Sequence, residues 1–139
     1  AHVDHVTDGD TVTLRIAGAE PERARLLGID TPETVKPDAP GECFGPEASA
    51  RTKVLLPEGT EVLVQRDAEA RDRYGRLLVY LWRRTDGLFV NRALLAEGYA
   101  SVLSIAPNTA RRADLAAAER QARSAGTGLW GACGDPGGR

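Results

Sequence analysis

Thr11-Val-Thr-Leu-Arg-Ile16, followed by Arg23-Ala-Arg-Leu-Leu-Gly-Ile29, is the stretch that decides the fold class of this sequence. Polar and apolar residues alternate in the first segment, which is typical of a strand with one buried face. The second segment is apolar toward its end and predicts another strand. Asp8-Gly9 and the Gly18–Pro21 segment carry turn residues. The first thirty residues are therefore predicted to form strands.

The remainder of the chain adds helices to these strands. Further strands are predicted over Glu61–Arg66 and Arg76–Trp82, and helices over Gly45–Leu55, from about Asn91 to Gly98, and over Thr109–Ala125. About five short strands, most of them before the three helices, indicate an α+β domain built on a small barrel. A loop rich in Pro, Gly and Asp runs from Thr31 to Gly45, and a loop of this length is usually functional or tied down.

Length and charge restrict the classes of function. The 139 residues suit one domain, and no apolar run approaches the roughly 20 residues of a membrane-spanning helix. A net charge of −2 argues against a nonspecific nucleic-acid coat protein, which is usually basic. Residues 66–92 nevertheless contain seven arginines and only four acidic residues. The net charge therefore does not exclude an enzyme that binds one or two phosphates locally.

Two acidic motifs could carry chemistry, Asp8-Gly-Asp10-Thr and Asp30-Thr-Pro-Glu33. Each is also typical of an ordinary polar turn. In the second motif, Pro32 favours an extended Thr31, so that a strand end presents two carboxylates and a backbone carbonyl within four residues. Such hard oxygen ligands suit Ca²⁺ or Mg²⁺ rather than zinc.

Two arginines complete the set of candidate residues. Arg25 lies within an apolar strand and needs a partner there, which could be a structural carboxylate or a substrate. Arg76 closes Asp72-Arg-Tyr-Gly-Arg76, in which Gly75 permits a tight turn, although a solvated hairpin has the same pattern. A metal and two arginines would neutralise charge on a phosphate, and a carboxylate would steer or deprotonate the attacking water. Together these residues indicate phosphoryl transfer.

At these residues the chain resembles the staphylococcal nuclease-like (thermonuclease) family. The similarity covers roughly Val3 to Gly131 and rests on motifs that occur in the family's order: Asp8-Gly-Asp-Thr-Val, Arg25-Leu-Leu-Gly-Ile-Asp-Thr-Pro-Glu33, Gly45-Pro-Glu-Ala-Ser-Ala50, Asp72-Arg-Tyr-Gly-Arg76, Val90-Asn-Arg-Ala-Leu94 and Gly128-Leu-Trp130. The resemblance implies a five-stranded OB-fold-type β-barrel with three α-helices. It also implies a micrococcal-type endonuclease that depends on Ca²⁺, hydrolyses phosphodiester bonds of DNA and RNA, and leaves 3′-phosphates.

The resemblance assigns roles to individual residues. The implied set consists of the metal ligands Asp10, Asp30 and, through its backbone carbonyl, Thr31, and of the catalytic residues Arg25, Glu33 and Arg76. Arg25 and Arg76 match the arginines that contact the scissile phosphate, and Glu33 matches the residue assigned to water activation. One departure concerns the segment from Gly98 to Pro107, where the family's type member has tyrosines that hold the nucleotide. This chain keeps only Tyr99 there, so base stacking is not implied.

Two other classes of function stay open. One is a non-catalytic nucleic-acid- or protein-binding OB module of the nuclease type, and the other is a purely structural or interaction domain. The presence of every catalytic-type side chain favours the enzyme. We expect the nuclease-like domain to span residues 3–131, with a C-terminal tail over 132–139, in a monomer that does not enter a membrane.

The two cysteines, Cys43 and Cys133, match no zinc pattern and no C-x-x-C motif. They form either a disulfide in an exported protein or two free thiols in a cytosolic one. A disulfide would join the long loop to the chain end and enclose about 90 residues, for which the chain-entropy model gives on the order of 4–5 kcal/mol at most. It would imply an oxidising compartment, and hence a secreted or extracytoplasmic bacterial protein whose signal peptide has been removed.

Overall fold

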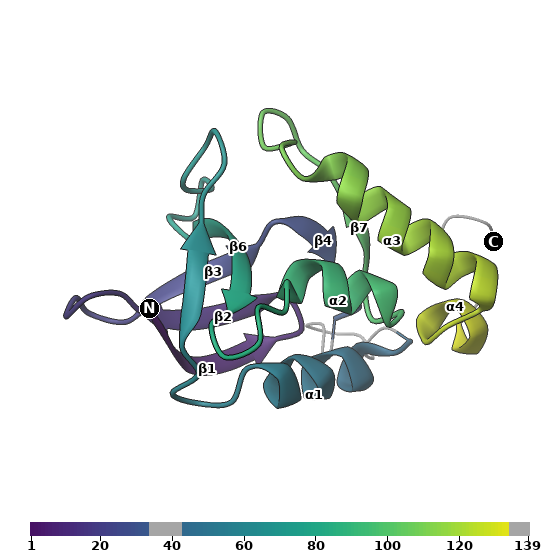
Figure 1. Ribbon diagram of the computed structural model, residues 1–139, viewed down its shortest axis with the longest axis horizontal. Coiled ribbons are helices and arrows are strands. Elements are labelled where there is room, and N and C mark those ends of the chain that lie inside the picture. Colours follow the sequence, from purple (N-terminus) through teal and green to yellow (C-terminus); the bar gives the residue numbers. More distant parts are fainter. Residues whose placement is uncertain (34–42, 134–139) are drawn as a thin grey trace.

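A five-stranded sheet and a smaller two-stranded sheet carry the helices in the computed structural model, which describes residues 1–33 and 43–133 (Figure 1). The strands are β1 (His2–Asp8), β2 (Thr11–Arg15), β3 (Glu22–Leu26), β4 (Gly28–Asp30), β5 (Val62–Gln65), β6 (Leu77–Arg83) and β7 (Ser101–Leu103). The helices are α1 (Gly45–Leu55), α2 (Val90–Ala96), α3 (Arg112–Ala125) and α4 (Leu129–Ala132). None of the described helices is long and apolar enough to cross a membrane.

The larger sheet has the strand order β1-β2-β3-β6-β5. Its pairs are antiparallel except for β3 and β6, which run parallel. The alternation in β2 places Val12 and Leu14 in the apolar core. The predicted α+β class with a five-stranded sheet is therefore confirmed. Backbone hydrogen bonds also join the two outer strands of this sheet, since Val3 N donates to Thr60 O (2.9 Å) and Val62 N donates to Ala1 O (2.9 Å).

The prediction of one continuous strand over Arg23–Ile29 is wrong. The chain bends at Leu27, so that β3 ends at Leu26 and β4 begins at Gly28, which has a φ of +80°. Glycine adopts this conformation without the steric cost of a side chain. A Cβ at Gly28 would also lie 2.4 Å from Leu115 Cδ1 of α3, so α3 packs directly on the bend.

After this bend, β4 pairs with β7 in a second sheet that the sequence patterns did not predict. The antiparallel register matches Gly28 with Leu103 and Asp30 with Ser101. The segment between Gly98 and Pro107 therefore fixes the strand end on which Asp30 lies. This pairing joins residues about seventy positions apart, which local patterns cannot show.

The helices follow the prediction closely at α1 and less closely near the C-terminus. Helix α1 spans the predicted residues and has proline in its first turn. Helix α3 begins at Arg112 rather than at Thr109, and the one-turn helix α4 was not predicted. The turn before α4 packs against the end of α2, because a Cβ at Gly128 would lie 2.4 Å from Gly98 O. Glycine at position 128 therefore permits this close backbone packing.

A disulfide joins Cys43 to Cys133, with a Cα–Cα distance of 6.0 Å. The prediction of a disulfide is confirmed, and the alternative of two free thiols is wrong. Cys43 lies just before α1 and Cys133 directly follows α4, so the bond connects the N-terminal side of the first helix with the C-terminal side of the last.

Candidate active site

Two carboxylates and an arginine meet where the ends of three strands converge. Arg25 Nη2 on β3 lies 3.3 Å from Asp10 Oδ2, in the turn between β1 and β2, and 3.4 Å from Asp30 Oδ1, at the end of β4. Both carboxylates therefore contact the same nitrogen. The structure brings together three residues that the sequence singled out separately. We call Asp10, Arg25, Asp30 and Thr31 the carboxylate corner.

Asp10 is the fixed carboxylate of this corner. Its Oδ2 accepts a hydrogen bond from Thr31 N (3.1 Å) and its Oδ1 accepts one from Thr11 Oγ1 (3.2 Å). The side chain is 12 % exposed, whereas that of Asp30 is 58 % exposed. Backbone and hydroxyl donors thus hold the Asp10 carboxylate, whereas the Asp30 carboxylate is open to solvent.

Arg25 has structural partners in addition to the two carboxylates. Its Nη1 donates to the carbonyl oxygens of Leu26 and Ile29, both at 2.9 Å, and the side chain is 15 % exposed. These carbonyls flank the bend between β3 and β4. The guanidinium therefore bridges the bend and orders the strand end that carries Asp30.

The corner has the chemistry of a hard-cation site. The hydroxyl Oγ1 of Thr31 is buried and has no hydrogen-bond partner in the described part of the chain. A Cβ on Gly9 would lie 2.6 Å from this oxygen, so only glycine leaves room beside it. Carboxylate, hydroxyl and carbonyl oxygens are ligands for Ca²⁺ and Mg²⁺. No group of three or more His, Cys, Asp or Glu suited to a metal occurs within residues 1–33 and 43–133, so a cation here would need further oxygens from water or substrate.

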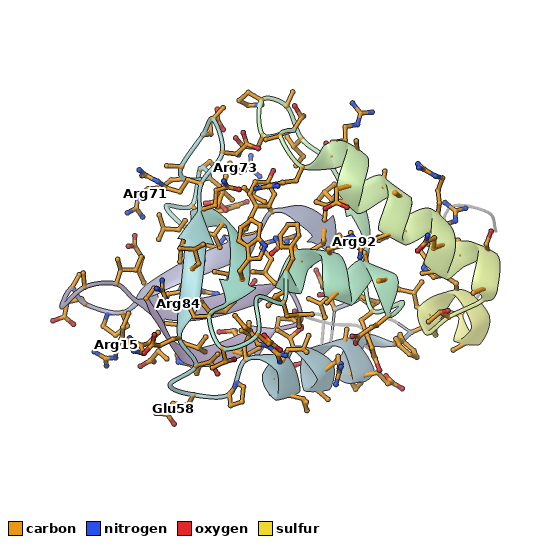
Figure 2. All side chains as sticks on the ribbon, viewed as in Figure 1. Arg15, Glu58, Arg71, Arg73, Arg84 and Arg92 are labelled. Carbon is orange, nitrogen blue, oxygen red and sulfur yellow. A yellow bond between two sulfur atoms is a disulfide. The ribbon has the colours of Figure 1, made fainter. Side chains whose placement is uncertain are left out.

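The second part of the site is the hairpin between β5 and β6, residues 67–76, which we call the arginine hairpin. Asp72 Oδ1 accepts hydrogen bonds from Tyr74 N (2.9 Å) and Arg76 N (3.0 Å), and its Oδ2 accepts one from Arg76 Nε (2.8 Å). Burial raises the pKa of Asp72, but these hydrogen bonds outweigh burial and hold the pKa below its usual value. A charged carboxylate thus clamps Arg76 through Nε. The same hairpin carries Arg71 and Arg73, both labelled in Figure 2.

One pocket of about 420 Å³ lies between the carboxylate corner and the arginine hairpin, and both Arg25 and Arg76 line it. Leu78, Leu103 and Ile105 add apolar surface to its wall, and Tyr74, 69 % exposed, stands at its rim. The sequence patterns missed Leu103 and Ile105 because the pairing of β7 with β4 brings that segment to the site. The order of residues within this short segment does not indicate a pairing with a strand so far away in the sequence.

Arg25 and Arg76 line this pocket, whereas the other residues singled out from the sequence lie outside its lining: Asp10, Asp30, Thr31, Glu33 and Tyr99. Glu33 is exposed and follows Asp30 by three residues. Tyr99 packs against Phe44, with ring centroids 5.4 Å apart, next to the disulfide-bonded Cys43. The tyrosine retained after Gly98 therefore stabilises the region before α1, and the pocket wall from this segment is aliphatic.

Comparisons with known proteins identify the family of this chain. The family model described as "Staphylococcal nuclease homologue" matches residues 23–132. The thermonuclease of Staphylococcus intermedius is 39% identical over 92% of this chain and 74% of its own length. The thermonuclease of Staphylococcus hyicus is 36% identical over 92% and 73%. Endonuclease YncB of Bacillus subtilis is 36% identical over 92% of this chain and 60% of its own length. The chain therefore belongs to the staphylococcal nuclease family.

Proposed function

We propose that this chain is a Ca²⁺-dependent nuclease that hydrolyses phosphodiester bonds of DNA and RNA and leaves 3′-phosphates. The observation that carries the proposal is the convergence of Arg25 and Arg76 on one pocket beside two carboxylates. The comparisons support the proposal because the named relatives are thermonucleases and an endonuclease.

The cation would be held by the carboxylates of Asp10 and Asp30 and by the backbone carbonyl of Thr31. The buried, unpartnered Thr31 hydroxyl and the all-oxygen donor set support this assignment. A divalent cation bound there supplies positive charge beside the phosphate and acidifies a bound water. With two protein carboxylates, the site should be open and weak until a substrate oxygen joins it.

The two arginines would bind the oxygens of the scissile phosphate and stabilise the negative charge that builds in the transition state. Arg76 is clamped to Asp72 through Nε, and its terminal nitrogens make no hydrogen bond to another described residue. In Arg25, the carboxylate contacts of Nη2 (3.3 and 3.4 Å) are longer than the carbonyl bonds of Nη1 (2.9 Å). Nη2 is therefore the nitrogen whose present contacts are more readily replaced by a contact with a phosphate oxygen.

Glu33 would activate or position the attacking water, because its exposed carboxylate follows the corner directly in the chain. Glu33→Gln keeps the shape of the side chain and removes its basicity. Turnover should fall sharply while a nucleotide still binds. If Glu33→Gln loses binding and keeps its rate per bound substrate, Glu33 is a residue that positions substrate.

Cleavage assays test the whole proposal. Single- and double-stranded DNA and RNA are incubated with Ca²⁺ or with EDTA, and the product ends are tested for a 3′-phosphate. We expect hydrolysis with Ca²⁺, none with chelator, and a higher Ca²⁺ requirement for Asp30→Asn. Full activity in EDTA contradicts the proposal. Retained nucleic-acid binding with no cleavage under any condition would favour the alternative, a non-catalytic OB module of the nuclease type.

We also infer that the larger sheet closes into an OB-type barrel and that the protein works outside the cytoplasm as a monomer. The hydrogen bonds between β1 and the start of β5 support the closure, and the disulfide supports an oxidising compartment. Limited proteolysis tests the proposed division into a domain over residues 3–131 and a tail over 132–139. Light scattering measures the oligomeric state, and alkylation of the native protein from its own host, read by mass, tests the compartment.

A further inference from the structure

A third arginine, Arg23, lies on the same face of β3 as Arg25. Side chains alternate along a strand, and Ala24 between these two residues is fully buried in the core. Residues i and i+2 of a strand are about 6.6–6.8 Å apart. This separation is comparable to the spacing of successive phosphates along an extended nucleic-acid strand, so the two guanidinium groups can serve neighbouring phosphates.

The neighbouring strand places Arg76 next to Arg23. In the parallel register, Ala24 lies beside Leu77 and Arg25 beside Leu78, and the same register one residue earlier puts Arg76 beside Arg23. A second, open hollow of about 500 Å³ lies here, with the lining Pro21, Glu22, Arg23, Tyr74, Gly75 and Arg76. Tyr74 and Arg76 also line the pocket of the active site, so the two hollows adjoin on either side of these residues.

The charge of this second hollow favours an anion. Arg23 is exposed, and its side chain has no hydrogen bond or ion pair with another residue in the described ranges 1–33 and 43–133. Glu22, the carboxylate in the lining, forms an ion pair with Arg71 of the arginine hairpin. The guanidinium carbons of Arg73 and Arg76 lie 5.0 and 5.7 Å from the centre of the Tyr74 ring. Positive charge therefore surrounds the ridge between the hollows.

We propose that this second hollow binds the phosphate next to the scissile one, with Arg23 as its ligand. The inference rests on the proposed function, because it takes the scissile phosphate to lie between Arg25 and Arg76. The substrate strand then crosses the ridge of Tyr74 and Arg76 and continues along the outer face of β3 toward Pro21. Substrates with a phosphate on both sides of this ridge gain a contact that a dinucleotide lacks.

Four proteins test the proposal: wild type, Arg23→Ala, Arg23→Lys and the control Arg120→Ala. Arg120 is also exposed, its side chain has no hydrogen bond or ion pair within the described chain, and it lies on α3, apart from β3 in Figure 1. KM and kcat are measured for a dinucleotide, which has one phosphodiester, and for a single-stranded tetranucleotide. Arg23→Ala should raise KM for the tetranucleotide by about tenfold, the effect of one charge-assisted hydrogen bond, and change kcat much less. Arg23→Lys should recover most of the loss.

Salt dependence gives a second readout. Each phosphate neutralised on a single strand contributes about 0.7 to the slope of log K against log salt. Arg23→Ala should lower that slope by about this amount, and Arg120→Ala should leave it in place. A change in KM by the same factor for dinucleotide and tetranucleotide, or a tetranucleotide KM and slope equal to those of Arg120→Ala, overturns the proposal.

A binding measurement separates this inference from the proposed function. Fluorescence anisotropy of a labelled oligonucleotide in EDTA reports affinity without cleavage. If wild type binds the oligonucleotide in EDTA but does not cut it after Ca²⁺ is added, the nuclease proposal fails, and the weaker binding expected for Arg23→Ala still supports the second hollow. Equal affinities of wild type and Arg23→Ala overturn the proposal that the second hollow binds a phosphate, even if cleavage is found.

Discussion

The carboxylate corner and the arginine hairpin each supply one arginine to the same pocket, yet the chain builds them in different ways. The corner combines residues from three strand ends, and Arg25 in it bonds two backbone carbonyls and two carboxylates. In the hairpin, Arg76 is held by Asp72 four residues earlier. Two arginines with the same proposed task therefore depend on the fold to different degrees.

The exposure of the two side chains expresses the same difference, 15 % for Arg25 against 28 % for Arg76. A buried carbonyl that loses its donor costs about 1–3 kcal/mol. Substitution of Arg25 therefore affects both stability and turnover, and substitution of Arg76 affects turnover. Four predictions test this contrast.

The largest effect is expected from the double variant Cys43→Ser and Cys133→Ser. Loss of this disulfide, which joins residues 90 positions apart, should lower the free energy of unfolding by up to about 4–5 kcal/mol, because the unfolded chain gains entropy. Hydrogen exchange then separates the two regions. The Thr31 amide, bound to Asp10, should exchange faster as whole-fold opening becomes easier, whereas the Arg76 amide, bound to Asp72, should change little. Equal acceleration of both amides would show that the hairpin also opens with the fold.

Arg25→Lys should lower turnover by about 10²–10³ and also destabilise the protein. Lysine keeps the charge but loses the planar fork, and removing one preorganised donor typically costs about this factor in rate. One of the carbonyls of Leu26 and Ile29 then lacks a donor, which should lower the free energy of unfolding by about 1–3 kcal/mol. Urea denaturation and kinetics on one preparation measure both effects. Wild-type stability in this variant would remove the structural role assigned to Arg25.

Arg76→Lys should reduce turnover by a similar factor of about 10²–10³ while stability changes by less than about 0.5 kcal/mol. The guanidinium bonds a single side chain within its own hairpin, so no buried backbone group loses its partner. The same two measurements apply. A loss of stability as large as that of Arg25→Lys would make the two regions equivalent, and wild-type turnover would exclude Arg76 as a transition-state contact.

Asp72→Asn should have the smallest effect, a fall in turnover of about three- to tenfold, since the amide still accepts backbone hydrogen bonds but loses the ion pair with Arg76. The pKa of Asp72 is lowered in the fold, so its stabilising contribution is present above the unfolded pKa of about 3.9 and is lost as pH falls through the lower folded pKa. Wild type and Asp72→Asn should therefore have parallel pH–rate profiles above about pH 4. A wild-type profile that converges on that of Asp72→Asn at pH 5–6 would show that Asp72 is protonated there.

Sequence reasoning worked best where the contacts are local. The hairpin was predicted from Asp72-Arg-Tyr-Gly-Arg76, and its clamp joins residues within that segment. The start of α1 was predicted from Gly45 and Pro46, because a helix end is specified by the residues next to it. The pairing of the cysteines could be stated as one of two possibilities, and the 6.0 Å Cα–Cα distance decides it.

The sequence by itself determined the class of the fold, the acidic and basic residues available for chemistry and the hairpin that presents Arg76. The tertiary structure alone decided the bend after Leu26, the pairing of β4 with β7 and the meeting of Asp10 and Asp30 on one nitrogen of Arg25. Turn, cap and alternation signals act over a few residues, whereas the pairing of Asp30 with Ser101 depends on packing between segments far apart in the chain. Such packing is selected by the total buried surface and hydrogen bonding of the whole domain, which no short pattern contains.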